Sequence, residues 1–322
     1  MVQYILVLLV LILTSYAYLK LATRFKIIDK PNQRSSHTKI TIRGGGIIFP
    51  ISVLLFFFFN DYQYPFFVLG VFLISVVSFL DDIYTLSSKI RFPFQFIAVF
   101  LILYQISFPF TPVYLFAFYL IFGIGTVNMF NFMDGVNGIT GIYSLVVLSG
   151  LFFINLNEHL INNDLIIYSS LSLLVFGYYN FRKKALFFAG DIGSIVIGMI
   201  VFFIGFLFAF KLSSPLILLL IIVYGADAGN TLLYRFLFTK ESVLEPHRHH
   251  IYQKLVDIYK IPHLKISAIY GVVQLIVNWI VLKTYKLDLL TQYIIFFALI
   301  LFFIFIYFLL FRILKKKMNN VL

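Results

Sequence analysis

Long apolar runs separated by short polar segments dominate the chain. The stretch 195–210 contains no charged residue, and neighbouring runs are similarly continuous. A helix needs about 20 mostly apolar residues to cross a membrane, whereas the strands of a membrane barrel alternate apolar with polar positions. The pattern therefore predicts a bundle of membrane-spanning helices.

Allowing about 17 to 20 apolar residues per crossing, we predict about eleven spans. They lie near residues 3–22, 44–60, 65–80, 92–108, 112–128, 138–154, 164–180, 192–210, 215–233, 265–283 and 291–311. No internal repeat or flexible linker interrupts them. The expected fold is an all-α integral membrane protein of about 10–11 transmembrane helices, with residues 1–322 forming one polytopic domain.

Composition agrees with this pattern. Apolar residues make up 61% of the chain and charged residues 12%, against about half and a quarter in soluble domains, so a soluble globular protein is excluded. The absence of cysteine excludes disulfides, a zinc–thiolate site and a cysteine nucleophile. The apolar N-terminus, followed by Lys20 and Arg24, predicts a retained first span and not a cleaved signal peptide.

The formal net charge of +12 raises the question of a nucleic-acid partner, which the position of the basic residues answers. They concentrate in alternate connections, and only Lys211, Lys283 and Lys286 fall on the other side. By the positive-inside rule, the N-terminus lies outside and the C-terminus in the cytosol. Orientation thus explains the excess without nucleic acid, and the tail at 315–317 is expected to contact anionic membrane lipid.

Four acids lie where predicted spans meet the cytosolic side: Asp81, Asp82, Asp134 and Asp191. Adjacent like charges at Asp81 and Asp82 repel each other unless a cation or a shared proton intervenes, which favours a divalent ion. The alternative is that the pair caps a helix or marks the water boundary.

Amides accompany the third acid. Asn128, Asn131 and Asp134 are spaced by three residues, so a helix would place them along one face, where amides can read the edge of a base. Turn formation by Asp134-Gly135 and Asn137-Gly138 is the alternative, but it does not require the two earlier amides.

The fourth acid lies in the segment Gly190-Asp191-Ile192-Gly193, at the expected start of a span. Asp191 is either an N-cap or a ligand of Mg²⁺, an ion that uses one or two carboxylates together with substrate phosphates.

A second glycine segment runs from Arg43 to Gly46. It either brings the backbone close to an anion or packs helices together through small residues.

A late polar loop contains His247, Arg248, His249 and His250. Imidazoles with an arginine suit a phosphate clamp or proton donor, while a transition-metal site and loop packing are the alternatives. Asp227 lies inside a predicted span, where a carboxylate is costly unless it faces protein. We expect it to support this loop.

Taken together and in this order, the motifs resemble the polyprenyl-phosphate N-acetylhexosamine-1-phosphate transferases of glycosyltransferase family 4. The matching segments are D-x-P-x-x-R-x-x-H from Asp29, R-G-G-G from Arg43, Asp81-Asp82 with Leu86, Arg91 and Gln95, N-x-x-N-x-x-D-G from Asn128, G-D-x-G-S from Gly190, and H-x-H-H from His247. The ordered set is far more specific than any single segment.

This resemblance implies transfer of an N-acetylhexosamine 1-phosphate from a UDP-sugar to undecaprenyl phosphate, giving undecaprenyl-diphosphate-sugar and UMP. It implies Mg²⁺ (Mn²⁺ as a substitute) and a multi-pass protein of the bacterial cytoplasmic membrane whose active site faces the cytosol. The reaction would initiate a surface polysaccharide such as O-antigen or teichoic acid. Site loops are expected near 23–43, 81–91, 129–138, 181–191 and 234–264, and a homodimer stays open.

Carried over residue by residue, the resemblance assigns three sets. The catalytic set is Asp81, Asp82, Asp134, His247, His249 and His250. The substrate-binding set is Arg34, His37, Arg43, Arg91, Asn128, Asn131, Asn137 and Arg248. The metal set is Asp191 and Asp82.

Three departures and two alternatives accompany this assignment. Asn137 stands where many relatives have a second Asp, Ile40 and Ile42 stand where prolines are common, and the loop continues as Ile251-Tyr252. The last feature favours the surface-polysaccharide subgroup over the phospho-MurNAc-pentapeptide translocase, which remains an alternative. A flippase of lipid-linked sugars is the alternative from another class, but transporters place charges near the midplane.

Overall fold

Each apolar run predicted to span the membrane forms a helix in the computed structural model, which describes residues 2–29, 40–239 and 248–319, with side chains to Leu314. The long helices are α1 (Val2–Arg24), α2 (Ile48–Phe59), α3 (Pro65–Tyr84), α4 (Ser88–Gln105), α5 (Val113–Met133), α6 (Ile139–Glu158), α7 (Asn163–Asn180), α8 (Gly190–Leu212), α9 (Ile222–Phe238), α11 (His263–Thr284) and α12 (Leu289–Asn319). The 3₁₀ helices η1 (Gly45–Ile47) and η2 (Pro215–Ile221) lead into α2 and α9.

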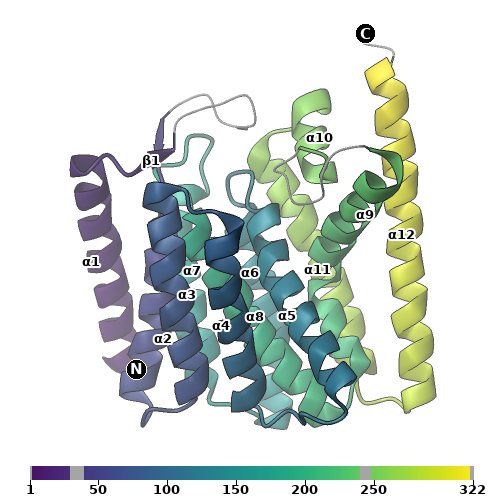
Figure 1. Cartoon of the computed structure of the whole chain (residues 1–322), viewed down its shortest axis with the longest axis horizontal. Coiled ribbons are helices and arrows are strands. Elements are labelled where there is room, and N and C mark those ends of the chain that lie inside the picture. The colour runs from purple at the N-terminus through teal and green to yellow at the C-terminus, as the bar shows by residue number, and fades with distance from the viewer. Residues whose placement is uncertain (1, 30–39, 240–247, 320–322) are drawn as a thin grey trace.

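Eight helical segments in the described part are long and apolar enough to cross a membrane. The predicted spans outside this set form α2, α4 and α7, which are shorter or more polar. The chain is therefore an all-α integral membrane protein, as predicted. Its helices run back and forth between two ends of one bundle, so that α1 begins at one end and α12 finishes at the opposite end (Figure 1).

Helix α8 forms the centre of the bundle. Of its most apolar window, 89% is buried inside the protein, compared with 11% for α12 at the edge (Figure 1). A helix that is apolar on every side requires neighbours or lipid on every side, and α3 and α5 pack closely against α8. Because Asp191 lies in its first turn, this acid is held at the middle of one end of the bundle.

The same end carries short elements that the sequence pattern does not predict. Strands β1 (Ile28–Asp29) and β2 (Thr41–Ile42) pair antiparallel, and α10 (Ile251–Tyr259) lies within the expected loop 234–264 (Figure 1). Strands of two residues are too short to show alternation. Helix α12 also continues past the apolar run at 291–311, because the residues that follow are mostly good helix formers.

Candidate active site

Asp82 closes the N-terminus of α8 from the neighbouring helix α3. Its Oδ1 accepts the backbone N–H of Asp191 at 2.8 Å and its Oδ2 accepts that of Ile192 at 3.2 Å, while Arg43 Nε lies 2.7 Å from Oδ1. The first N–H groups of a helix have no partner within the helix, and the preceding Ala189 supplies none. The alternative that Asp191 caps its own helix is therefore wrong, because Asp82 performs that task.

Gly190 makes this cap sterically feasible. Its φ of +73° lies in the left-handed region, and a Cβ there would collide with the Asp82 carboxylate and lie 2.7 Å from the backbone nitrogen of Gly44. Only glycine combines that conformation with so close an approach.

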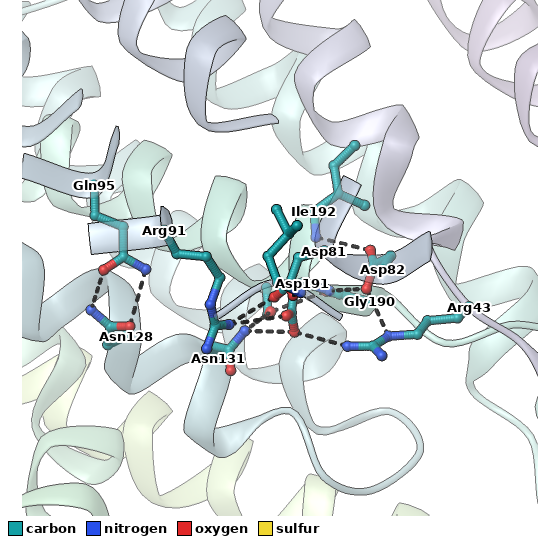
Figure 2. Close-up of polar contacts among 12 residues, drawn as sticks. Arg43, Asp81, Asp82, Arg91, Gln95, Asn128, Asn131, Gly190, Asp191 and Ile192 are labelled. Carbon is teal, nitrogen blue, oxygen red and sulfur yellow. Dashed lines mark hydrogen bonds and ion pairs between the residues drawn. The ribbon is translucent and has the colours of Figure 1, made fainter. Parts of the chain in front are cut away.

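Asp81 meets the side chain of Asp191. The Nη1 atom of Arg91 lies 2.8 Å from Asp81 Oδ2 and 3.3 Å from Asp191 Oδ2, so one guanidinium joins both acids (Figure 2). The two carboxyl groups therefore both lie within 3.3 Å of the same nitrogen atom. Two carboxylates at this separation require a proton or a cation between them.

Arg43 provides the second cation, with Nη2 3.3 Å from Asp191 Oδ1. Burial opposes the charge of this guanidinium, but the carboxylates of Asp191 and Asp82 outweigh that effect and raise the pKa of Arg43 above its usual value. The site thus keeps two permanent positive charges beside its acids.

The amides of α5 contribute to two different contacts (Figure 2). Asn131 Nδ2 donates to Asp191 Oδ1 at 2.9 Å and lies 3.3 Å from Ser194 Oγ. Asn128 instead forms a reciprocal pair with Gln95 of α4, with N···O distances of 2.9 and 3.2 Å. The three-residue spacing therefore directs one amide to the acids and the other to the helix that carries Arg91.

Asp134 follows directly after α5, and its backbone N–H donates to Asn131 O at 3.2 Å. Burial raises the pKa of the Asp134 carboxyl to about 6. Asn137 lies farther along the same turn, and its Nδ2 donates to the carbonyl oxygens of Arg182 and Lys183 at 2.9 and 3.3 Å. These contacts hold two loops together, and the substrate-binding role of Asn137 stays a prediction.

The glycine segment after Arg43 packs against the start of α8. The N–H groups of Gly45 and Gly46 donate to the carbonyl oxygens of Phe188 and Ala189 at 2.8 and 2.9 Å, and a Cβ on Gly46 would collide with Gly193. The structure shows the packing role for Gly45 and Gly46, whose N–H groups are already used, and the approach of an anion to this segment stays a prediction.

The histidine loop is held by contacts within the protein. Arg248 forms a bidentate ion pair with Asp257 of α10, at 2.7 and 2.8 Å from Nη2. His250 is 3% exposed, and its Nδ1 lies 3.2 Å from Asp227 Oδ1. The expectation that Asp227 supports this loop is confirmed. Arg34, His37 and His247 lie outside the described residues.

The donor set at the acid cluster fits Mg²⁺. Within residues 2–29, 40–239 and 248–319, no group of three or more His, Asp or Glu side chains could hold a metal by itself. Mg²⁺ does not need one, because it binds through one or two carboxylates and completes its shell with water and phosphate oxygens. Asp191 and Asp81 supply two such carboxylates beside one guanidinium, whereas the Asp82 carboxylate is turned toward the backbone N–H groups of α8.

Two tyrosines that sequence reasoning missed belong to this end of the bundle. Tyr252 donates its hydroxyl to Phe132 O at 3.0 Å, and Tyr270 donates to Asp227 Oδ2. With 21 tyrosines in an apolar chain, no local signal separates these two from tyrosines that only pack.

The fold and the site together define a multi-pass membrane protein with a cluster of acids, arginines and amides at one end of its bundle. Comparison with known proteins narrows the class of membrane protein further. The profile of glycosyl transferase family 4 matches residues 64–209, which include Asp81, Asp82, Asn131 and Asp191. The chain is similar to this family over the segment that carries the site, and this similarity together with its apolar helices indicates a membrane-embedded transferase.

Individual relatives agree with the family. The chain is 25% identical over 294 residues to a probable undecaprenyl-phosphate N-acetylglucosaminyl 1-phosphate transferase of Bacillus subtilis, with 84% of this chain and 80% of the relative covered. It is 26% identical to a phospho-N-acetylmuramoyl-pentapeptide-transferase of Dictyoglomus turgidum, covering 64% and 72%. A protein of the same name from Thermotoga maritima is 31% identical over 48% of this chain and 56% of the relative.

Proposed function

We propose that the protein transfers an N-acetylhexosamine 1-phosphate from a UDP-sugar to undecaprenyl phosphate, with release of UMP. The observation that carries this proposal is the shared contact of Asp81 and Asp191 with Arg91 at one end of a membrane bundle. The relative from Bacillus subtilis, which matches over most of both chains, supports the lipid acceptor and the sugar-phosphate donor by its name.

The charges of the site suit this reaction. A nucleotide diphosphate and a lipid phosphate repel each other, so bringing them together requires fixed positive charge that is already in place. Arg43 and Arg91 provide it from two sides of Asp191. When bound, Mg²⁺ would be held by Asp191 with Asp81 and would stabilise the negative charge on the donor diphosphate.

Asp81 is the acid best placed to act on the acceptor. It shares Arg91 with Asp191, whereas Asp82 is turned toward the backbone of α8. We assign Asp81 to orient the lipid phosphate and to take its proton. An oxygen of that phosphate then forms a bond to the β-phosphorus of the donor, the bond from that phosphorus to the bridging oxygen breaks, and UMP leaves.

The position of the site supports a membrane-borne acceptor. The acids lie in the last turn of α3 and the first turn of α8. Both helices are long enough to span the bilayer, so the acids are expected at the membrane surface. The basic residues of alternate connections gather at this same end, which by the positive-inside rule faces the cytosol. We therefore propose a bacterial cytoplasmic-membrane enzyme that meets its nucleotide-sugar on the cytosolic side and initiates a surface polysaccharide.

The test is UMP release by the purified protein with undecaprenyl phosphate, Mg²⁺ and a panel of UDP-N-acetylhexosamines. UDP-MurNAc-pentapeptide belongs in the panel because two relatives are named for that transfer. We expect UMP that depends on lipid, metal and Asp191, with Asp164→Asn at the opposite end of the bundle as the matched control. Protein that releases no UMP with any donor but moves a lipid-linked sugar across vesicles would be a flippase instead.

A further inference from the structure

A second polar centre lies inside the bundle, on α9. Asp227 is 0% exposed, although it belongs to a segment long enough to span the membrane. A lone carboxylate at such a position is costly, so its contacts must compensate for lost hydration.

Five donors converge on its two oxygens. The donors to Oδ1 are His250 Nδ1 at 3.2 Å, the Ile251 N–H at 3.0 Å and the Thr231 hydroxyl at 3.3 Å, and those to Oδ2 are the Tyr252 N–H at 3.3 Å and the Tyr270 hydroxyl. Three of the five come from the residues that begin α10. Asp227 therefore caps α10, much as Asp82 caps α8.

These contacts also determine which ring nitrogen of His250 carries a hydrogen. A carboxylate surrounded by donors acts only as an acceptor, so the imidazole nitrogen that faces it must bear hydrogen. That nitrogen is Nδ1. The opposite ring nitrogen, Nε2, then points away from Asp227, and the orientation of the ring is set by an acid that is itself held on all sides.

The capped end of α10 reaches the turn that carries Asp134 through Tyr252. Its hydroxyl donates to Phe132 O at 3.0 Å, at the end of α5, and its ring packs so closely on Gly135 that a Cβ there would collide with it. Asp134 lies between those two residues. The position of the histidine loop relative to the Asp134 turn thus depends on where Asp227 holds residues 250–252.

We propose that Asp227 is a positioning residue of the transferase: it holds His250 with Nδ1 protonated and fixes the start of α10 against the turn that carries Asp134. Asp227 touches neither substrate and acts through these two contacts. The kinetic part of this inference rests on the proposed function, whereas the proton on His250 Nδ1 does not.

The kinetic test compares Asp227→Asn with Asn278→Leu. The first variant keeps the size of the side chain but places an amide NH₂ among donors. The second removes a similarly buried amide of α11 that is hydrogen-bonded to Val146 of α6 and Gln274 of α11 instead of to the start of α10. We expect Asp227→Asn to lower kcat by about 10- to 100-fold with KM for the UDP-sugar changed less than about threefold, and Asn278→Leu to leave kcat near wild type at equal thermal stability. Equal kcat losses in both variants would overturn the positioning role.

A spectroscopic test is independent of turnover. The chain has six histidines, so ¹⁵N-histidine labelling in membranes gives a small set of ring signals, and the His250→Gln variant identifies those of His250. We expect a protonated Nδ1 in the wild type and loss of that signal pattern in Asp227→Asn. A bare Nδ1 in the wild type would overturn the proposal even if UMP release succeeds, and a protonated Nδ1 would uphold this contact even if no donor is turned over.

Discussion

The Oδ1 atom of Asp82 lies 2.8 Å from the backbone nitrogen of Asp191, a residue 109 positions later in the chain. The preceding residue, Asp81, meets the side chain of that same Asp191 through Arg91. Two adjacent acids on α3 therefore hold one acid on α8 by its backbone and by its carboxylate. The two adjacent acids therefore have different roles: Asp82 caps α8, and Asp81 faces the carboxylate of Asp191. Neither role requires that both acids bind a metal.

Replacing Asp191 by Asn tests the proposed metal site. The amide keeps the shape of the side chain but removes the charge that faces Arg43 and Arg91 and that would hold Mg²⁺. We expect UMP release to be abolished while expression and membrane insertion are unchanged. Activity above about a tenth of wild type would remove Asp191 as the metal ligand.

Gly190→Ala is expected to disturb both stability and activity. At a φ of +73° an alanine is strained, and its Cβ would displace the Asp82 carboxylate from the start of α8. We expect a loss of more than about 1 kcal/mol in the free energy of unfolding, seen as a lower thermal midpoint in detergent. Gly205→Ala in the same helix is the matched control, because a Cβ there meets nothing within 4 Å; a lower midpoint in that variant too would point to a general intolerance of α8.

The amide pair of Gln95 and Asn128 is expected to position Arg91, which lies one helical turn before Gln95 on α4. Removing either amide loosens α4 against α5 and so weakens the contact of Arg91 with both acids. Gln95→Ala, Asn128→Ala and the double variant form a cycle, which we expect to give a coupling of about 1 kcal/mol in kcat/KM. Strictly additive effects would mean that the two amides act separately, Asn128 as a substrate contact.

Asp134 predicts a pH dependence of stability. Burial raises its pKa to about 6, so the native protein binds this proton more tightly than the unfolded chain, whose aspartates titrate near about 3.9. As the pH rises through that window, ionisation of Asp134 lowers the free energy of unfolding. The thermal midpoint of Asp134→Asn should therefore exceed that of wild type by more at pH 7 than at pH 4, and a constant difference would contradict the raised pKa.

Much of the architecture follows from the sequence alone. The length of the apolar runs predicts the helices, and the alternation of basic connections predicts which ends lie together, because both depend on properties read along the chain. On this basis the sequence predicts one shared end for four acids, and the structure brings them to the same end of the bundle: Asp81, Asp82, Asp134 and Asp191.

What each of these residues does there was decided only by tertiary structure. The roles of Asp82 as a cap and of Gln95 as the partner of Asn128 depend on contacts between helices far apart in the chain. For Asp227 the sequence predicts support of the late loop, and the structure adds that it caps α10. The sequence of an apolar helix predicts that the helix is covered by other helices or by lipid. It does not predict which helix packs against it, because many helix faces in this chain are nearly equally apolar. The packing of α8 against α3 and α5 determines which helices are neighbours. Only this packing brings polar residues that are distant in the sequence together into one site.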